Sequence, residues 1–284
     1  MLSIHEFVDQ QKLFGHRIHE HDGIYWEEIY PFYCKPAFPF TQFNPGDARP
    51  SAFRSLLGYS HHVNNFEDGN RWSPFMVLDR SRLDSFSLLQ LPSKKRNQVR
   101  RALEHCLIKP ILDIEFHLER IREINVSQSL RQEHGAGAET PVRRYIYEAD
   151  KWREQVRREF LLSGREWLGA FVDGVLVAYL RTYQVEKIKV IQQTKVDTAY
   201  FKFLPMDALY YTVLLYTAAD NNCQRIVNGD PKHVSLNHFK EQFLFSAVEY
   251  PVYSSNAWVV ETAKNLFFQR SRPFSFLSNL KVLK

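Results

Sequence analysis

The sequence lacks the cysteine pattern of a disulfide-stabilised or zinc-binding protein. Its cysteines are odd in number, far apart and without a CxxC motif: Cys34, Cys106 and Cys223. A disulfide framework and a zinc–thiolate site are therefore not expected. No cysteine has a recognisable nucleophile context and no GxSxG motif is present, so a covalent acyl-enzyme is not expected either.

Long hydrophobic runs are also missing. The longest, ALYYTVLLYTAA from Ala208, is too short to span a bilayer. At the N-terminus, Glu6 and Asp9 stand where a signal peptide needs a continuous apolar core. These absences predict a cytoplasmic protein without a membrane span.

Neither the histidines nor the overall charge points to a particular ligand. The stretch HEHD from His19 to Asp22, and the pair His61 and His62, match neither HExxH nor another established ligand spacing, so no metal site is expected. Basic residues number 37 against 32 acidic ones, which gives a formal net charge of +5. Because this excess is mild, the positions of the charges must indicate the partner.

The sequence does contain enough apolar material for a large core. Of its 284 residues, 44% are hydrophobic and 14% are aromatic, which suits one large domain or two medium ones that share an interface. The first ninety residues mix aromatic side chains with frequent prolines, and these prolines exclude a long helix there. The run WSPFMVLD from Trp72 has the composition of a strand.

A strongly basic helix is expected after Pro92 and Ser93, in the stretch LPSKKRNQVRRALEHC. Five positive charges fall within eight residues of it: Lys94, Lys95, Arg96, Arg100 and Arg101. The apolar stripe of this helix is expected to be Val99, Ala102, Leu103 and Cys106. That stripe leaves the basic residues on the other faces.

Two uses of these charges remain open. Lysine and arginine are good helix formers, so the basic face is either simply solvated or a site for phosphates. Only Glu104 lies close enough along the helix to offset the charge, and Arg96 and Arg100 repel each other at i,i+4. A ligand with several phosphates would relieve this repulsion through charge-assisted hydrogen bonds.

The C-terminal part has the order helix, strand, strand, strand, helix, strand, helix. A polar stretch from Ser127 to Pro141 is expected to be a loop or a boundary, and a helix is expected over roughly 142–162. The run WLGAFVDGVLVAYL alternates on both sides of Asp173 and Gly174, as in a β-hairpin.

Further elements follow the hairpin. KIKVIQQTKV predicts a third strand, Pro205 begins a helix through Ala219, and QRIVNGD predicts a buried strand and a turn. LNHFKEQFLF predicts a short helix with Leu236, Phe239 and Phe243 directed inward, and AWVVETAKNLFFQR is helix-like, before a basic tail. This order indicates an α/β (α+β) arrangement with a largely antiparallel sheet.

Four of these stretches, in this order, resemble landmarks of the GNAT superfamily, and specifically of its Fem-like branch of peptidyltransferases and FemAB-like acetyltransferase domains. They are KKRNQVRRAL, WLGAFVDGVLVAYLRTY, AYFKFLPMDALYYTVLLYTA and RIVNGDPKHVSLNHFKEQF. The resemblance implies two packed GNAT-like halves with the active cleft at their junction. The N-terminal half, over 1–110 and including the basic helix, would be degenerate, and 111–284 would be the acyltransferase half.

The resemblance also implies the chemistry, which is transfer of an acyl group to an amine. The donor in this branch is acyl-CoA, such as acetyl-CoA, or an aminoacyl-tRNA, and the acceptor would be a small-molecule or peptide amine. Most acetyl-CoA-dependent members hold the pyrophosphate in a glycine-containing loop at a helix N-terminus. The equivalent stretch here, TAYFKFLPMDA, has no glycine, so phosphates would rely on Lys202 and on backbone N–H groups near Met206.

Candidate site residues follow from the same comparison. Backbone N–H groups of the third strand near Gln192, Gln193, Thr194 and Lys195 would polarise the donor carbonyl. Asp230, in the turn NGDP, would either only form the turn or take a proton from the attacking ammonium. Lys240 would stabilise an oxyanion or a phosphate, and its alternative is an exposed lysine between two buried phenylalanines.

Three functions therefore remain to be separated. The first is an N-acyltransferase that works by direct attack on a thioester or ester. The second is a non-catalytic phosphate- or RNA-binding module on a GNAT scaffold, in which Lys95, Arg96, Arg100 and Arg101 hold phosphates. The third is a Fem-like aminoacyl-tRNA-dependent peptidyltransferase, for which tRNA would be a partner.

Overall fold

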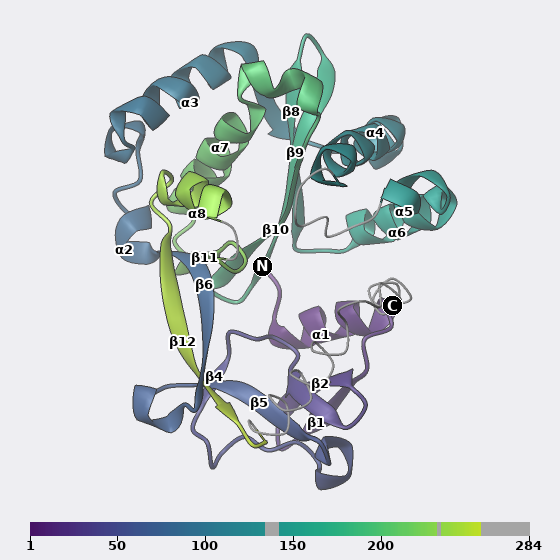
Figure 1. Cartoon of the computed structure of the whole chain (residues 1–284), viewed down its shortest axis with the longest axis vertical. Coiled ribbons are helices and arrows are strands. Elements are labelled where there is room, and N and C mark those ends of the chain that lie inside the picture. Colours follow the sequence, from purple (N-terminus) through teal and green to yellow (C-terminus); the bar gives the residue numbers. More distant parts are fainter. Residues whose placement is uncertain (134–141, 232–233, 257–284) are drawn as a thin grey trace. The chain divides into compact units, whose positions relative to one another are not determined.

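The structure is a computed structural model and describes residues 1–133, 142–231 and 234–256 (Figure 1). The chain divides into two compact units. The larger contains Met1–Phe7 and Pro74–Val248, and the smaller contains Val8–Ser73 and the segment from Glu249. The basic helix belongs to the larger unit, and the expected division into GNAT-like halves at residue 110 stays a prediction.

One sheet forms the centre of the larger unit. Its strand order is β6-β11-β10-β9-β8-β7, and neighbours are antiparallel except β10 and β11, which are parallel. The strands are β6 (Arg71–Asp79), β7 (Leu107–Pro110), β8 (Arg165–Val172), β9 (Val175–Val185), β10 (Ile188–Val196) and β11 (Arg225–Val227).

Helices cover both faces of this sheet (Figure 1). One face is packed by α3 (Ser93–His105), α7 (Pro205–Ala219) and α8 (Val234–Glu241), with the short α2 (Arg80–Leu83) beside them. The opposite face is packed by α4 (Ile114–Glu133), α5 (Val142–Ile146) and α6 (Ala149–Leu161). Alternation along the strands directs successive side chains to the two helix layers, as with Tyr179 toward α4 and Leu180 toward α7.

The expected hairpin is confirmed as β8 and β9. Asp173 has a φ of 49° and Gly174 a φ of 78°, so both central residues adopt the left-handed conformation that a two-residue hairpin turn requires. The third strand, the helix that begins at Pro205, and the short strand at Arg225 are also confirmed.

The polar stretch after Ser127 is helical rather than a loop, at least as far as Glu133, where α4 ends. The prediction was wrong because polar side chains of this helix bind the sheet instead of water. Gln128 Oε1 accepts from the Val196 N–H at 3.1 Å, and Ser127 Oγ accepts from the Thr198 N–H at 3.1 Å. Residues 134–141 lie outside the described part.

Smaller corrections concern helix boundaries and faces. The helix expected over roughly 142–162 is two helices, α5 and α6. Leu103 and Leu236 were expected to face the core, but both are exposed, Leu236 to 53%. Phe239 of α8, partly buried, and the following buried Phe243 do face the core as expected, and their rings pack against Tyr210. The helix-like stretch from 257 and the basic tail lie outside the described residues.

The smaller unit is mainly β structure. Its elements include β1 (Ile18–His21), β2 (Ile24–Tyr30), β3 (Tyr33–Pro36), β4 (Gln42–Phe43) and β5 (Gly58–Val63). The end of β12 (Ser246–Ser254) pairs antiparallel with β5, and Trp26 and Cys34 lie in the core of this unit. Helix α1 (Ile4–Leu13) begins in the larger unit and ends in the smaller one.

Short 3-10 helices connect several of these elements. The 3-10 helices are η1 (Ala52–Ser55), η2 (Phe66–Asp68), η3 (Leu88–Gln90) and η4 (Thr198–Phe203). The three cysteines are free and buried. Within the described residues, no helix combines the length and apolarity that crossing a membrane requires.

Candidate functional site

The larger unit has an open strand edge in the middle of its sheet. Strand β11 pairs with β10 only from Ile188 to Val190, whereas β10 continues to Val196. On its other side β10 stays paired with β9, with a bulge between Ile191 and Gln193. In the part of the chain that the structure describes, no strand therefore pairs with β10 beyond Val190 on the β11 side.

The backbone groups that point from this edge can be identified. The Asp197 N–H donates to Val177 O at 2.9 Å, toward β9, and the Val196 N–H points the other way, to Gln128 Oε1. Because backbone groups alternate along a strand, Thr194 directs its N–H and C=O to the same side as Val196. Thr194 thus presents its backbone groups to the open edge.

On the α7 and α8 face, hydrogen bonds connect this edge to a buried lysine. Tyr210 OH accepts from Asn228 Nδ2 at 2.9 Å, and the Thr194 side chain also bonds to this phenol. Lys240 Nζ donates to Asn228 O at 2.6 Å and is buried. Burial raises the pKa of Tyr210, so its phenol stays protonated at neutral pH.

The N-terminus of α7 is occupied by an internal ion pair. Lys95 Nζ lies 2.5 Å from Asp207 Oδ1, and both residues are buried. The ammonium also lies 4.6 Å from the Phe239 ring centroid. Burial raises the pKa of Asp207, while the Lys95 ammonium acts in the opposite direction. The Asp207 N–H and the Ala208 N–H both bond to Leu204 O, which leaves few first-turn donors for an anion.

The basic side chains of helix α3 lie in three different environments. Lys95 lies on the buried side, so the expectation that all five charges avoid the apolar face is wrong for this residue. Arg96 donates to Leu89 O at 3.3 Å and Leu91 O at 3.2 Å, and Arg101 donates to Lys202 O at 3.4 Å. Lys94 and Arg100 are exposed and form no ion pair within the described residues.

The other expected site residues lie around the ends of β10 and β11. Asp230 is exposed, one residue after Gly229, whose φ is 62°. Lys202 is exposed on η4, and Met206 is partly buried against the core at the start of α7. Gln192, at the bulge, accepts from Arg165 Nη1 at 3.1 Å. The strands thus bring Gln192, Gln193 and Thr194 to the open edge, whereas Lys95 is turned into the core.

The α4 and α6 face of β10 has a separate polar cluster. Asn125 Nδ2 donates to Tyr179 OH at 2.8 Å, and Tyr179 OH donates to Gln193 Oε1 at 3.3 Å. Arg181 forms an ion pair with Glu159 and stacks on Trp167, with its guanidinium 4.6 Å from the ring centroid. Burial raises the pKa of Tyr179. Gln193 and Thr194 therefore place polar groups on opposite faces of the strand.

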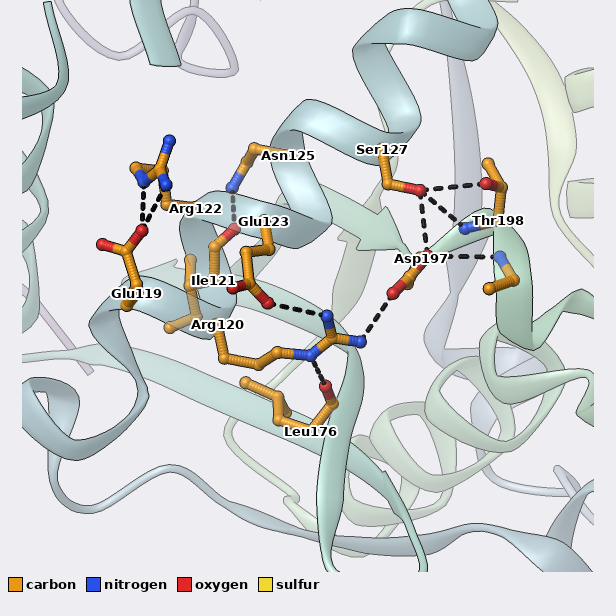
Figure 2. A network of polar contacts seen from close by, with 11 residues as sticks. Glu119, Arg120, Ile121, Arg122, Glu123, Asn125, Ser127, Leu176, Asp197 and Thr198 are labelled. Carbon is orange, nitrogen blue, oxygen red and sulfur yellow. Dashed lines mark hydrogen bonds and ion pairs between the residues drawn. The ribbon is translucent and has the colours of Figure 1, made fainter. Parts of the chain in front are cut away.

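An open hollow of about 690 Å³ lies along α4, where it meets α5 and the end of β10. Figure 2 shows Arg120 holding α4 in place, because its guanidinium donates to Leu176 O at 2.8 Å and to Asp197 Oδ2 at 2.6 Å. Ser127 Oγ donates to Asp197 Oδ1 at 2.9 Å. At the rim, the Arg131 guanidinium lies 4.8 Å from the centroid of the Phe201 ring.

Sequence reasoning missed several of these groups. Asn125 and Gln128 occupy the buried side of α4, one turn apart and next to Ile121 and Ile124. Amides at helical spacing within an apolar stripe are the signal that would have found them. Glu159 carried no such signal, because it looks like one of many charges on an amphipathic helix. Within the described residues, no group of three histidine, cysteine or acidic side chains is placed to hold a metal ion.

Comparison with known structures gives the fold. FemX matches with a TM-score of 0.58 at 12% identity, covering 92% of each chain. The C-terminal domain of a putative lysylphosphatidylglycerol synthetase from Agrobacterium fabrum matches with a TM-score of 0.57 at 11% identity, covering 92% of this chain and 90% of that one. L-PGS from Bacillus licheniformis matches with a TM-score of 0.52 at 13% identity, over 88% and 90%.

At the level of sequence, no family model and no curated protein matches. The structural likeness and the order of elements nevertheless agree with the motifs of the sequence. The chain has the GNAT/Fem-like fold that those motifs predicted.

Proposed function

We propose that this protein transfers an acyl group from an ester or thioester donor to an amine by direct attack. The observation that carries the proposal is the open edge of β10, where the Thr194 N–H has no strand partner among the residues that the structure describes. A donor carbonyl that accepts from this N–H is polarised, and the same bond strengthens as negative charge develops on the oxygen.

The reaction forms one bond and breaks one. The acceptor nitrogen bonds to the carbonyl carbon, and the bond from that carbon to the donor oxygen or sulfur breaks. Asp230, exposed after β11, takes a proton from the attacking ammonium. The Tyr210 phenol, which burial keeps protonated, donates to the leaving atom, and the second proton that the nitrogen loses as the amide forms restores the phenol. Lys240 Nζ donates to the backbone carbonyl of Asn228 and so fixes this residue, whose side-chain amide donates to the Tyr210 phenol.

An aminoacyl ester such as aminoacyl-tRNA fits the site better than acyl-CoA. Residues 198–205 contain no glycine, and the Asp207 carboxylate stands in the first turn of α7. A pyrophosphate at that helix end would find the first turn occupied by the ion pair of Lys95 with Asp207 and few free N–H donors. The structural neighbours named FemX and lysylphosphatidylglycerol synthetase point in the same direction.

The exposed cations of α3 suit the backbone of such a donor. Lys94 and Arg100 lie on the outer side of the helix, and phosphate contacts of this kind position a nucleic acid without reading its sequence. The acceptor is a small-molecule or peptide amine.

A donor screen tests the proposal. Purified protein is incubated with an amine panel and either radiolabelled aminoacyl-tRNA or radiolabelled acetyl-CoA, and labelled product is separated from donor. We expect transfer from aminoacyl-tRNA. Transfer from acetyl-CoA alone would overturn the donor assignment, and transfer from neither would overturn the function.

Paired variants test the contacts to the donor. The double variant Lys94→Ala, Arg100→Ala should weaken tRNA binding and lower the slope of log affinity against log salt by roughly two. Arg143→Ala, Arg158→Ala removes two exposed cations from the opposite helix layer and serves as the control. Equal losses in the two double variants would contradict the assignment.

A second candidate is a non-catalytic RNA-binding module, favoured by the same exposed cations on α3. It predicts salt-dependent RNA binding that Lys94→Ala, Arg100→Ala removes, but no transfer with any donor. The donor screen therefore separates it from the enzyme.

A further inference from the structure

A small polar cavity lies under the bulge of β10, on the face that α5 and α6 cover. Its volume is about 80 Å³, and its polar lining includes Arg144, Gln155, Glu159, Arg181 and Gln193. Liquid water occupies roughly 30 Å³ per molecule, so the cavity has room for one small polar group. Tyr179 and Trp167 form the floor on the sheet.

The acceptors of this cavity are already satisfied. Glu159 Oε1 accepts from Gln155 Nε2 at 2.9 Å, and Glu159 Oε2 pairs with Arg181. Gln155 Oε1 accepts from Arg144, and Gln193 Oε1 accepts from Tyr179 OH at 3.3 Å. A ligand group that needs an acceptor would therefore have to break an existing bond.

Donors, by contrast, remain available. Arg181 Nε is buried and has no hydrogen-bond partner within the described residues. A buried N–H without a partner costs free energy, and more so when it belongs to a charged group. Arg144 uses one Nη on Gln155, which leaves further guanidinium N–H groups. The cavity therefore suits a ligand that accepts hydrogen bonds.

The charge balance selects a monoanion. Arg144 and Arg181 contribute two positive charges and Glu159 one negative charge, so the lining carries a net charge of +1. A carboxylate neutralises this charge and matches the planar arginine fork. A phosphate dianion would overcompensate it and would face the Glu159 carboxylate at close range.

We propose that this cavity binds a carboxylate of the acceptor, so that the acceptor is an amino acid or a peptide end that carries its amine a few bonds from that carboxylate. Strand β10 connects the cavity to the open edge. Gln193 borders the cavity and its neighbour Thr194 presents the N–H of the open edge, and Cα atoms of adjacent residues are about 3.8 Å apart. A carboxylate in the cavity therefore holds a nearby amine close to the donor carbonyl. The acceptor assignment rests on the proposed transfer function, but the carboxylate site does not.

Binding of three small probes tests the site itself. Acetate, acetamide and methylammonium are titrated into the whole protein at constant ionic strength, and the melting temperature is measured. Acetate should raise it saturably, and the other two should not. Inorganic phosphate should bind more weakly than acetate, and tighter phosphate binding would overturn the carboxylate assignment.

Variants locate the binding. Arg144→Gln should weaken acetate binding roughly tenfold or more, and Arg181→Lys should weaken it despite the retained charge, because the fork is lost. Arg143→Gln, on the same helix but exposed, is the matched control. Unchanged acetate affinity in Arg144→Gln, or no acetate binding by the wild-type protein, would overturn the site.

The acceptor assignment has its own readout. In the transfer assay, wild-type protein should use an amino acid with roughly tenfold higher kcat/KM than the corresponding amide, and Arg144→Gln should remove this preference. Acetate binding without any transfer would leave the site standing while the proposed function fails. Transfer without a preference for the carboxylate would overturn the acceptor assignment and leave the proposed function standing.

Discussion

The two faces of β10 differ in how their buried charges are satisfied. On the α7 side, Lys95 pairs with Asp207 and Lys240 bonds to the Asn228 carbonyl. On the α6 side, Arg181 pairs with Glu159 but keeps a buried Nε without a partner in the described part of the chain, beside a small cavity. A closed ion pair mainly serves folding, whereas an unmatched donor next to a cavity is suited to a ligand. The open edge of β10 lies between these two environments.

Loss of the buried ion pair between Lys95 and Asp207 should have the largest effect on stability. Lys95→Ala leaves the Asp207 carboxylate buried without its cation, so the free energy of unfolding should fall by about 3 kcal/mol or more. Urea unfolding followed by tryptophan fluorescence measures the change. The double variant Lys95→Met, Asp207→Leu should recover most of the loss, since no charge remains. A loss below about 1 kcal/mol in Lys95→Ala would mean that water reaches this pair.

Two buried tyrosines, Tyr210 and Tyr179, lie on opposite faces of β10. Tyr210→Phe and Tyr179→Phe each remove a phenol that bonds an asparagine, so each should cost about 1–2 kcal/mol of stability. Their kinetics should differ. Tyr210→Phe should lower kcat roughly a hundredfold because the leaving atom loses its proton donor, whereas Tyr179→Phe should mainly raise the KM of the acceptor.

Steady-state kinetics with both variants checks this difference. Equal reductions of kcat would show that the two faces do not have separate roles. A Tyr210→Phe variant with wild-type kcat would remove this residue from the mechanism.

The smallest effect concerns the carboxylate that joins α4 to the end of β10. Burial raises the pKa of Asp197, but hydrogen bonds from Arg120, the Ala199 N–H and Ser127 outweigh it, so the pKa is lowered from 3.8. A carboxylate whose pKa is lower in the folded state stabilises the protein at pH values above its pKa in the unfolded state. This stabilisation is lost as the pH falls through its pKa in the folded state. The wild-type protein should therefore lose more stability than Asp197→Asn between pH 5 and pH 2.

Unfolding in urea at a series of pH values measures this dependence for both proteins. Parallel curves would contradict the assignment. Asp113→Asn, an exposed carboxylate at the start of α4, is the control for nonspecific effects of acid.

Local signals in the sequence predicted much of the fold. Asp173 and Gly174 predicted the hairpin because few other residues adopt that turn, and Pro205 predicted the start of α7 because its fixed φ suits a first helical turn. The polar segment after Ser127 was predicted as a loop but is helical as far as Glu133. Its polar side chains bond to the end of β10 and the residues after it, and nothing nearby in the sequence indicates this contact.

Less of the site could be predicted from the sequence, because its contacts also join residues that are distant along the chain. The family motifs brought attention to Gln192–Lys195, which form the open edge, and to Lys240, but not to the ion pair of Lys95 with Asp207 or to the bond between Asn125 and Tyr179. Lys95 and Asp207 are separated by 112 residues, and Asn125 and Tyr179 by 54. Such pairs form only when helices pack on the sheet, so composition and periodicity cannot reveal that a basic residue is buried or that an amide bonds to a tyrosine.

The proposed mechanism depends on the Thr194 N–H, which polarises the donor carbonyl at the open edge of β10. Single-turnover transfer by Thr194→Pro and Thr194→Ala tests it most directly, because proline removes this N–H, which does not take part in pairing with β9, and alanine keeps it. We predict that Thr194→Pro, folded by circular dichroism, loses at least roughly a hundredfold in rate, while Thr194→Ala stays within about tenfold of the wild-type protein. A folded Thr194→Pro variant that transfers as fast as Thr194→Ala would contradict the account.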